Sequence, residues 1–520
     1  MNSHISRSRF HPDNRFRSVR QQQGRVLLDA DWNESVDLRA WQDQQAAQDL
    51  LGDSAAPGAG MAVTAPPDGR ELEVAAGRLY IEGVGVENTA ALSLRGLEVI
   101  DDALPDGSYL VYAERHSVGV TALEEPEIAA PALRGYASSS RTREELRLGL
   151  LALPAAGDLS LRDPRDETPD YQQFRSAYAD SGRPRLRATL TTPELGGPAE
   201  YTGVENALYR IEVHTGGPAG SAQFKWSRSN ASDALEWTGQ SGDLLDVRAA
   251  EPRRAYWQPG DWIEVGDASG TGLIQLIADD GDQLRVILDS YIPPAGSVNS
   301  ALDFADFSGA EGRPLTVRRW DMRGETALLD IPADPAEQVA IEAGLAVSFT
   351  ELSFSGATAE FRAGDAWLIP ARTTGAAIEW PNPANDGENQ GWRPPRLPQQ
   401  AFARLAWAQR SGGLWSVLAD TRRSFASLSA PTLAYLGGDG QSALPGQQLA
   451  APLSVLVSAS GAGPICDVRV RFTIESGDSS ALLMDPDDPA RTGSSLDVFS
   501  NLDGLASVRW QLDSVTASQR

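Results

Sequence analysis

The chain has 520 residues, which is too long for one hydrophobic core and suggests roughly three or four domains. Of these residues 41% are hydrophobic and 22% are charged, which is the composition of a folded protein. Its formal net charge of −26 disfavours nucleic acid and anionic lipid as partners, because both would be repelled. A single cysteine, Cys466, excludes an intramolecular disulfide and a thiolate metal cluster, and no apolar run reaches the roughly 18 residues of a membrane-spanning helix.

The first predicted element is a helix over residues 31–51, which follows a polar, arginine-rich arm. Apolar residues recur along one stripe of this helix at Val36, Ala40, Ala47 and Leu51, with Leu38 and Trp41 beside it. Asp31 and Glu34 form a capping-box pattern, and Gly52 follows as a stop signal. Such a helix either packs on its own domain or docks, with the arm, onto another subunit.

Residues 54–67 are rich in Ala, Pro and Gly and predict a linker. After it the apolar period changes to that of strands, since Leu72 and Val74, then Leu79 and Ile81, alternate around Gly77. Residues 108–116 supply another strand. We therefore expect an arm-and-helix segment over residues 1–60 and a small β module over residues 61–155.

A second polar stretch, residues 158–187, lacks periodicity and predicts a surface connection, placed over residues 156–200. Beyond it, residues 209–214 and 284–288 alternate as half-buried strands, with Tyr209, Ile211 and Val213 opposite Arg210, Glu212 and His214, and with Leu284, Val286 and Leu288 on one face. The string QPGDWIEV at 258–265 is echoed by RAGDAWLIP at 362–370. A central β region over residues 201–429, with one or two related domains, follows from these patterns.

From residue 430 onward, short strands alternate with turns rich in Gly, Pro, Ser and Asp. The clearest strands cover residues 467–478 and 503–512, and Cys466 is interpreted as a small buried group that opens the first of them. This spacing is typical of a β-sandwich over residues 430–520. The predicted fold class is mainly β and multidomain, with an N-terminal helix, sandwich-like or barrel-like modules and a C-terminal sandwich.

Seven strings occur in order between about residues 10 and 425: QQGRVLLDADWNE (22–34), YLVYAERHSVGVTALEEPEIAAPAL (109–133), YTGVENALYRIEVHTGG (201–217), FKWSRSNAS (224–232), GDWIEV (260–265), VRRWD (317–321) and GDAWLIPART (364–373). Together they resemble a bacterial family of unknown function that is associated with gene clusters for phage-tail-like contractile injection systems. The resemblance implies a structural or accessory component of a baseplate, spike or fibre region, and it carries over no catalytic residue.

Two further strings, GDGQSALPGQQL (438–449) and DGLASVRWQL (503–512), resemble bacterial immunoglobulin-like domains of the invasin and intimin type. That resemblance implies one more strand after the Trp510 segment, so the domain is completed from elsewhere or the chain is a fragment. The start of the chain lacks the apolar segment of a secretory signal. We therefore expect no signal peptide, synthesis in the cytoplasm, and later incorporation into an assembled particle.

The chain shows no recognisable catalytic, cofactor or metal pattern. Its four histidines, His4, His11, His116 and His214, are scattered, and no nucleophile motif or phosphate-binding loop occurs. We predict no catalytic residue, no cofactor and no metal site. Two alternatives stay open: paired carboxylates of a carbohydrate-active enzyme, and calcium at the acidic turns 279–282 and 485–488, although neither turn has the twelve-residue calcium-loop pattern.

The chain has 13 tryptophans, and exposed indoles would stack on sugars or anchor protein interfaces, whereas buried ones fill the core. The turn-associated examples are Trp226, Trp257, Trp262, Trp367 and Trp380. The candidate interaction residues are Trp32, Trp41, Trp226, Trp262 and Trp367.

The leading hypothesis is a non-catalytic subunit of a phage-tail-like injection particle. Its expected partners are other tail-like or baseplate-like subunits in an oligomeric assembly, with a glycan or a cell-surface receptor as a further ligand. The alternatives are a surface adhesin or carbohydrate-binding protein, and a carboxylate-dependent carbohydrate-active enzyme.

Overall fold

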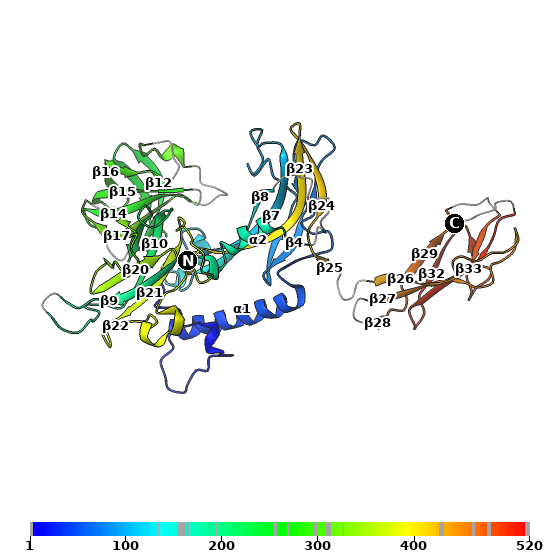
Figure 1. Ribbon diagram of the computed structural model, residues 1–520, viewed down its shortest axis with the longest axis horizontal. Coiled ribbons are helices and arrows are strands. Elements are labelled where there is room, and N and C mark those ends of the chain that lie inside the picture. The colour runs from blue at the N-terminus through cyan, green and yellow to red at the C-terminus, as the bar shows by residue number, and fades with distance from the viewer. Residues whose placement is uncertain are drawn as a thin grey trace. The chain divides into compact units, whose positions relative to one another are not determined.

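The computed structural model describes residues 4–133, 135–153, 163, 166–193, 196–252, 257–267, 270–294, 300–307, 314–325, 327–425, 431–459, 463–475 and 480–514. The fold is mainly β and multidomain, as predicted (Figure 1). It divides into two compact units. Unit 1 comprises Met1–Ala55 with Met61–Arg423, and unit 2 comprises Ala56–Gly60 with Ser424–Arg520.

Helix α1 (Asp29–Leu51) confirms the predicted N-terminal helix, which begins two residues earlier than expected. Its sequence contains neither Gly nor Pro, and Gly52, with a φ of 77°, ends it by donating its backbone N–H to the carbonyl of Gln48. The predicted capping box is wrong. Leu28 is the N-cap and makes no side-chain cap bond, because Asp31 lies inside the first turn and binds Arg9 instead.

The longest strands of unit 1 form one antiparallel sheet in the order β24-β23-β7-β8. The central strand β7 pairs with β8 on one side and with β23 on the other, so chain segments nearly 300 residues apart share one sheet. The strand predicted over residues 108–116 is the middle of β7. The four strands are β7 (Gly107–Val120), β8 (Arg141–Leu153), β23 (Gln399–Ser411) and β24 (Leu414–Asp420).

Short strands at the start of the β region replace the predicted linker. Ala55, Met61 and Val63 are buried, so residues 54–67 are part of the folded core rather than a linker. The alternation around Gly77 is confirmed, since Leu72, Val74, Leu79 and Ile81 are all buried. The strands are β1 (Ser54–Pro57), β2 (Val63–Thr64), β3 (Glu73–Val74), β4 (Gly77–Ile81), β5 (Val84–Asn88) and β6 (Leu92–Ser93).

The central region of unit 1 contains a five-stranded sheet, β18-β11-β10-β21-β22, and a three-stranded sheet, β19-β20-β9, which share one hydrophobic core. Their strands are β9 (Arg185–Leu190), β10 (Ala207–Thr215), β11 (Gln223–Ser227), β18 (Leu329–Asp330), β19 (Val339–Ala340), β20 (Leu345–Thr350), β21 (Ala366–Arg372) and β22 (Ala377–Ile378).

Beside these sheets, six strands close into a barrel in the order β12-β13-β16-β15-β14-β17. The barrel has its own core, which includes Trp237, Ile263 and Val286. Leu288, predicted to be buried with Leu284 and Val286, is exposed, because the register of β15 and β16 shifts along this hairpin. The strands are β12 (Ala234–Ser241), β13 (Leu244–Arg248), β14 (Asp261–Asp267), β15 (Gly270–Asp279), β16 (Gln283–Ile292) and β17 (Thr316–Arg323).

The stretch predicted as a polar surface connection is largely structured. Helix α2 (Pro169–Ser176) begins at the N-cap Thr168, whose hydroxyl accepts a hydrogen bond from the Tyr171 N–H, and Tyr171 is buried. Arg183 and Arg185 are buried as well. The prediction took polar residues to be exposed, but these arginines have partners inside the fold, as in the Arg183–Asp365 ion pair. Residues 158–162, 164 and 165 of that stretch lie outside the described residues.

The repeated Gly-Asp-Trp pattern corresponds to a repeated local structure. Gly260 and Gly364 both have a positive φ, of 85° and 88°, and each precedes an aspartate that is buried. Asp261 accepts the backbone N–H of Gln258 at 3.0 Å, and Asp365 accepts that of Arg362 at 3.2 Å, so the same turn starts both strands. The strands belong to different sheets, β14 to the barrel and β21 to the five-stranded sheet.

Unit 2 is a β-sandwich around a core that includes Val457, Val470 and Val508, as predicted for the C-terminal region. Its larger sheet has the order β26-β27-β33-β30-β31 with β28 beside β27, and β29 and β32 form the smaller sheet. The strands are β25 (Ser424–Phe425), β26 (Pro431–Gly437), β27 (Leu453–Ala459), β28 (Gly463–Pro464), β29 (Arg469–Thr473), β30 (Leu482–Met484), β31 (Thr492–Gly493), β32 (Ser495–Phe499) and β33 (Leu505–Gln511).

Cys466 is exposed rather than buried, because it lies in the bend before β29, where Asp467 has a positive φ of 57°. One more strand was expected after the Trp510 segment. Residues 515–520, which follow that segment, lie outside the described part of the chain.

Gly83 sets how closely the β4–β5 hairpin approaches α1. A Cβ at Gly83 would overlap the backbone carbonyl of Gln44, and the residue has a positive φ of 79°. We predict that Gly83→Ala lowers the free energy of unfolding by about 1–2 kcal/mol for the left-handed conformation and by about 1–3 kcal/mol more for the overlap. Urea unfolding followed by tryptophan fluorescence measures this loss.

Gly242 is the matched control, since it lies in the β12–β13 hairpin with a φ of 62° and has nothing within 4 Å of its added Cβ. Gly242→Ala should show only the conformational part of the loss. Equal destabilisation by the two substitutions would contradict the role assigned to the Gly83 contact.

Candidate functional site

The structure distributes the five candidate tryptophans between the core and the surface. Trp226, Trp262 and Trp367 are buried together in the core of the five-stranded sheet, so they offer no exposed aromatic platform. Trp41 is half-buried and packs on Phe10, with ring centroids 6.3 Å apart. Trp32 has 73% of its surface exposed and is the one exposed tryptophan of the chain, all thirteen of which are described.

Trp32 belongs to an apolar stripe on the outer face of α1. Leu28, Trp32 and Val36 recur every four residues, and their exposed fractions are 43%, 73% and 54%. Leu50 is exposed further along the helix. At 100° per residue, these side chains lie on one side of the helix. The predicted apolar stripe is therefore not the buried face, because Val36 and Ala40 face solvent.

The opposite, inner face of α1 combines buried apolar residues with polar contacts. Its buried residues are Ala30, Glu34 and Leu38. The Gln44 side-chain amide donates to the Glu82 carbonyl at 2.8 Å, and burial raises the pKa of Asp37 above its usual range although Arg396 opposes the shift. Helix α1 thus buries both apolar and polar side chains, and it also exposes the large apolar residues Trp32, Val36 and Leu50, which an ordinary surface helix would turn inward.

The arm before α1 is fixed at its beginning. The Ser6 backbone N–H donates to Asp29 at 2.9 Å, Arg9 pairs with Asp31 at 2.6 Å, and Arg7 pairs with Glu379. Burial alone would raise the pKa of Asp29, but its hydrogen bonds from Ser6 lower it overall. These contacts anchor residues 6–9 to the body of unit 1.

The rest of the arm is exposed. Every side chain between His11 and Leu28 is exposed except Val19, which is half-exposed. This stretch includes the large apolar residues Phe16, Val26 and Leu27, and the Gln42 side chain donates to the Arg17 carbonyl at 3.1 Å. Figure 1 shows the loop of the arm outside α1, at the edge of unit 1. We call Phe16, Val26, Leu27, Leu28, Trp32 and Val36 the arm–helix surface.

Four arginines accompany this surface. Arg15, Arg17, Arg20 and Arg25 make no ion pair with any residue that the structure describes. The segment thus presents both arginines and an exposed indole, which are among the residue types that dominate binding energy at protein interfaces. Sequence reasoning singled out Trp32 but missed the apolar residues of the arm. Of these residues, only Leu28 had a sequence signal, its four-residue spacing with Trp32 and Val36, opposite Leu38.

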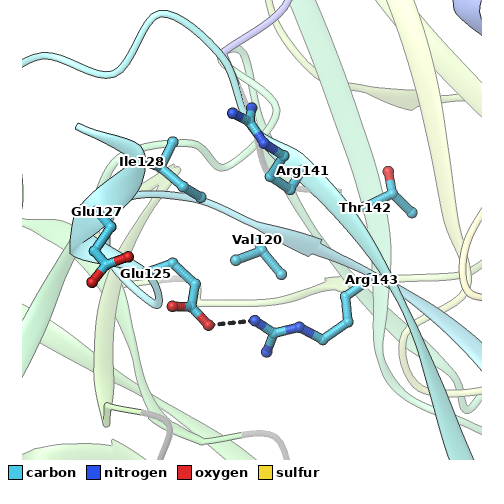
Figure 2. Close-up of a pocket in the computed structure, with 7 residues that line it drawn as sticks. All are labelled: Val120, Glu125, Glu127, Ile128, Arg141, Thr142 and Arg143. Carbon is cyan, nitrogen blue, oxygen red and sulfur yellow. Dashed lines mark hydrogen bonds and ion pairs between the residues drawn. The ribbon is translucent and has the colours of Figure 1, made fainter. Parts of the chain in front are cut away.

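A separate pocket of about 370 Å³ lies at the end of the β7–β8 hairpin (Figure 2). It is lined by Val120 of β7, by Glu125, by Glu127 and Ile128 of the short helix η2 (Pro126–Ile128), and by Arg141, Thr142 and Arg143 of β8. Glu125 forms an ion pair with Arg143, and Arg141 donates to the Ser139 hydroxyl at 2.7 Å. The pocket can therefore hold a small polar molecule, but its described lining presents no nucleophile activated by a base.

A buried charge cluster surrounds Lys225, the only lysine of the chain, whose side chain is 2% exposed. Its ammonium group pairs with Glu264 and lies 3.3 Å from Glu212, and it stands over the Trp320 ring at 4.4 Å from the centroid. Lys225 and Glu212 are cross-strand neighbours on β11 and β10, and Glu264 is on barrel strand β14. The cluster therefore joins the five-stranded sheet to the barrel.

This cluster explains why β10 is buried on both faces rather than half-buried as predicted. Arg210 and His214 are buried beside Glu212 on its polar face. Burial opposes ionisation of Glu212, but Arg210 and Lys225 outweigh it and lower its pKa to about 2. Burial, followed by the charge of Lys225, lowers the pKa of His214 to about 4. These shifts indicate a structural ion-pair network between two sheets.

The two acidic turns, residues 279–282 and 485–488, bind nearby groups of the same chain through their carboxylates. Asp279 accepts the backbone N–H groups of Trp257 and Gly281, at 2.7 and 3.0 Å, and Asp485 pairs with Arg491 at 2.8 Å. Across the described ranges, no three His, Cys, Asp or Glu side chains gather as a metal site. No helix in the described part of the chain is long and apolar enough to cross a membrane.

Residues 1–192 match a family of unknown function (DUF6519). The expected similarity to such a family is confirmed for this segment, while its association with contractile injection systems stays a prediction. The matched segment includes the arm and α1, and thus the whole arm–helix surface. No curated protein matches the chain.

Lys225→Met tests the buried cluster. The substitution leaves Glu212 and Glu264 without their shared cation, and we predict that it lowers the free energy of unfolding by about 3–5 kcal/mol, as breaking one side of a buried ion pair does. The double variant Lys225→Met/Glu264→Gln should recover part of this loss, since it removes one uncompensated charge. Urea unfolding measures both, with the exposed pair Arg78–Glu87 as the control, where Arg78→Met should have little effect.

The low pKa of His214 predicts a loss of stability in acid. The imidazole has its ordinary pKa of 6.5 in the unfolded chain and a pKa of about 4 in the folded protein. Between pH 6.5 and pH 4, protonation of His214 therefore favours the unfolded chain. Its contribution is complete above pH 6.5 and is lost as the pH falls towards 4, amounting to about 2–3 kcal/mol at pH 4.5. His214→Gln should therefore lose less stability than the natural chain between pH 7 and pH 4.5 in urea titrations. Equal losses would contradict the assignment.

Proposed function

We propose that this chain is a non-catalytic structural or binding subunit of a phage-tail-like contractile injection particle, in its baseplate, spike or fibre region. In this proposal the arm–helix surface attaches the chain to its neighbours. The C-terminal sandwich is an immunoglobulin-like domain that faces a receptor or cargo. The observation that carries the proposal is the group of large apolar side chains, Leu28, Trp32 and Val36, that lies in solvent along α1.

An exposed apolar stripe on a rigid helix supports attachment better than any other feature of the described chain. Large apolar side chains that are scattered singly over a surface are common, but a contiguous group marks an interaction site. Here Leu28, Trp32 and Val36 form such a group, and the arm adds Val26 and Leu27 directly before it. The resemblance of the string at residues 22–34 to a family from injection-system gene clusters coincides with this surface.

The proposed contact of unit 2 with a receptor or cargo is supported by its edge strand. In β26, Leu433 and Tyr435 are largely exposed, and Leu436 on the other face is exposed too. Aromatic and aliphatic side chains on an edge strand are suited to contact with a partner.

The alternative of a carbohydrate-binding protein loses its main support. It required exposed tryptophans at the Gly-Asp turns, but Trp226, Trp257, Trp262 and Trp367 are buried, and Trp380 donates its indole N–H to Gly391 at 2.8 Å. The alternative of a carbohydrate-active enzyme requires a free acid–base pair of carboxylates. In the pocket of Figure 2 one of the two carboxylates, Glu125, is held by Arg143.

Incorporation into particles tests the proposal. We predict that the tagged chain, expressed in its native bacterium, co-sediments with phage-tail-like particles that electron microscopy identifies. Trp32→Ser/Val36→Ser should reduce its amount per particle at least tenfold, because losing one hot-spot tryptophan typically costs about 2 kcal/mol or more of binding energy. Immunoblotting of the purified particles measures this amount.

Leu414→Ser/Leu418→Ser is the matched control, since these residues of β24 are also exposed and lie four apart. This variant should be incorporated normally. Full incorporation of the Trp32 variant, or absence of the natural chain from purified particles, would refute the proposal.

A further inference from the structure

We infer that α1 pairs with α1 of a second copy of this chain, in an antiparallel contact with two-fold symmetry. This neighbour rests on the proposed function, which places an attachment at the surface that includes Trp32 and Val36. The order of the exposed residues along α1 supports the pair, because that order is complementary to its own reverse.

The outer face of α1 carries a heptad pattern of exposed residues. Along one line of the helix, the spacing between exposed positions alternates between four and three residues. This spacing keeps each position within about 40° of the line, which is the arrangement by which one helix packs along another. The series covers about 27 Å of helix and consists of Trp32, Val36, Arg39, Asp43, Ala46 and Leu50.

The series matches itself when one helix is reversed. If the two-fold axis passes at the level of Trp41, each residue faces the one that lies equally far from position 41 on the other helix. Large apolar, small apolar and oppositely charged residues then meet in three kinds of layer: Trp32 with Leu50, Val36 with Ala46, and Arg39 with Asp43. Each kind of layer occurs twice, once on either side of the axis.

The two charged positions determine the direction and the register of the pair. Arg39 and Asp43 are exposed and form no ion pair with any residue that the structure describes. A parallel pair would place each of them against its own equivalent, and a shift by one heptad would place Trp32 against Asp43. Polar residues at central positions of paired helices specify register in this way, at some cost in stability.

The wider charge distribution also favours the pair. Residues 1–28 contain six arginines and one aspartate, a net charge of +5, whereas residues 29–51 contain six carboxylates and one arginine, a net charge of −5. The hydrogen bond from the Gln42 side chain to the Arg17 carbonyl holds the arm beside α1 at the level of the axis. The basic arm of each copy therefore lies close to the acidic helix of the other.

The arm leaves the outer face of α1 open. Its contacts with the middle of the helix are at Trp41, which packs on Phe10, and at Gln42. At 100° per residue, Trp41 lies about 180° and Gln42 about 80° from the middle of the series. Trp32 is 73% exposed with the arm in place, so a second helix can approach along this face.

The predicted contact is small. Interfaces that bury less than about 1,200 Å² are typical of weak, reversible association, and one pair of helices of this length with its two arms belongs to that class. We therefore expect a dimer of twice the monomer mass of 55.6 kDa, with a dissociation constant of about 1–50 µM. A two-fold contact closes on itself, so no larger species should follow.

Analytical ultracentrifugation of the full chain tests the pair. The natural chain should show a monomer–dimer equilibrium between about 1 and 100 µM. Arg39→Glu should weaken the dimer at least tenfold, because two attractive layers become contacts between like charges. Trp32→Ser/Val36→Ser should weaken it at least a hundredfold, since each dimer contains both residues twice.

Exchanging the charges tests the occupant and its direction. The double variant Arg39→Glu/Asp43→Arg should dimerise within about threefold of the natural chain, because opposite charges meet again in the two central layers. A mixture of the Arg39→Glu chain with the Asp43→Arg chain should also form dimers, although neither chain pairs with itself. A parallel pair predicts neither the loss in the single variant nor the recovery in the double variant.

Two variants of unit 2 are matched controls. Arg469→Glu and Asp503→Arg make the same changes of charge at exposed positions outside α1. Both should dimerise as the natural chain does. Circular dichroism spectra identical to that of the natural chain show that the α1 variants remain folded.

A natural chain that stays at 55.6 kDa up to about 100 µM, or that assembles beyond a dimer, would overturn the inference. So would a dimer that Arg39→Glu leaves unchanged, or an exchange of charges that restores no association. If the chain is monomeric alone but still needs Trp32 and Val36 to enter particles, the proposed function stands and the second-copy neighbour is wrong. If the dimer forms as described yet the chain is absent from particles, the proposed function fails instead.

Discussion

The contact between Gly83 and the backbone of α1 determines which side of that helix faces solvent. The β4–β5 hairpin turns at Glu82 and Gly83, both with positive φ, and presents the Glu82 carbonyl to the side chain of Gln44. Since Gly83 has no Cβ, the helix backbone at Gln44 can lie directly on the turn. A helix held at Gln44 in this way turns Trp32 and Val36 to solvent, and the arm–helix surface is the result.

Periodicity in the sequence identified elements, but it did not determine what they pack against. The spacing of apolar residues predicted α1 to within two residues of its start, and it predicted β7, β10 and β33 as strands. It predicted barrel-like modules but not which strands close the barrel, because closure depends on the pairing of β12 with β17, which are far apart in the chain. Polarity concealed α2, whose buried surface is mainly that of one side chain, Tyr171.

The candidate site was predicted only in part, and for related reasons. Trp32 and the docking role of the helix were proposed from the sequence, whereas Trp226, Trp262 and Trp367 are core residues. The Gly-Asp turns direct the strands of Trp262 and Trp367 into the interior. The alternation of residues 209–214 suggested one solvated face. That face is buried instead, because Lys225 and Glu264 supply charges to Glu212 that no local pattern could reveal.

The burial of Lys225 also has a practical consequence for the chemistry of the whole molecule. The chain has 45 basic side chains, yet Lys225 is its only lysine, and it is enclosed between the five-stranded sheet and the barrel. The folded protein therefore presents no lysine amine to acylating or imidating reagents. An assembly built from such chains would resist aldehyde and active-ester fixation at its lysines, so its contacts would have to be captured through other groups, such as carboxyl groups, guanidinium groups or the exposed thiol of Cys466.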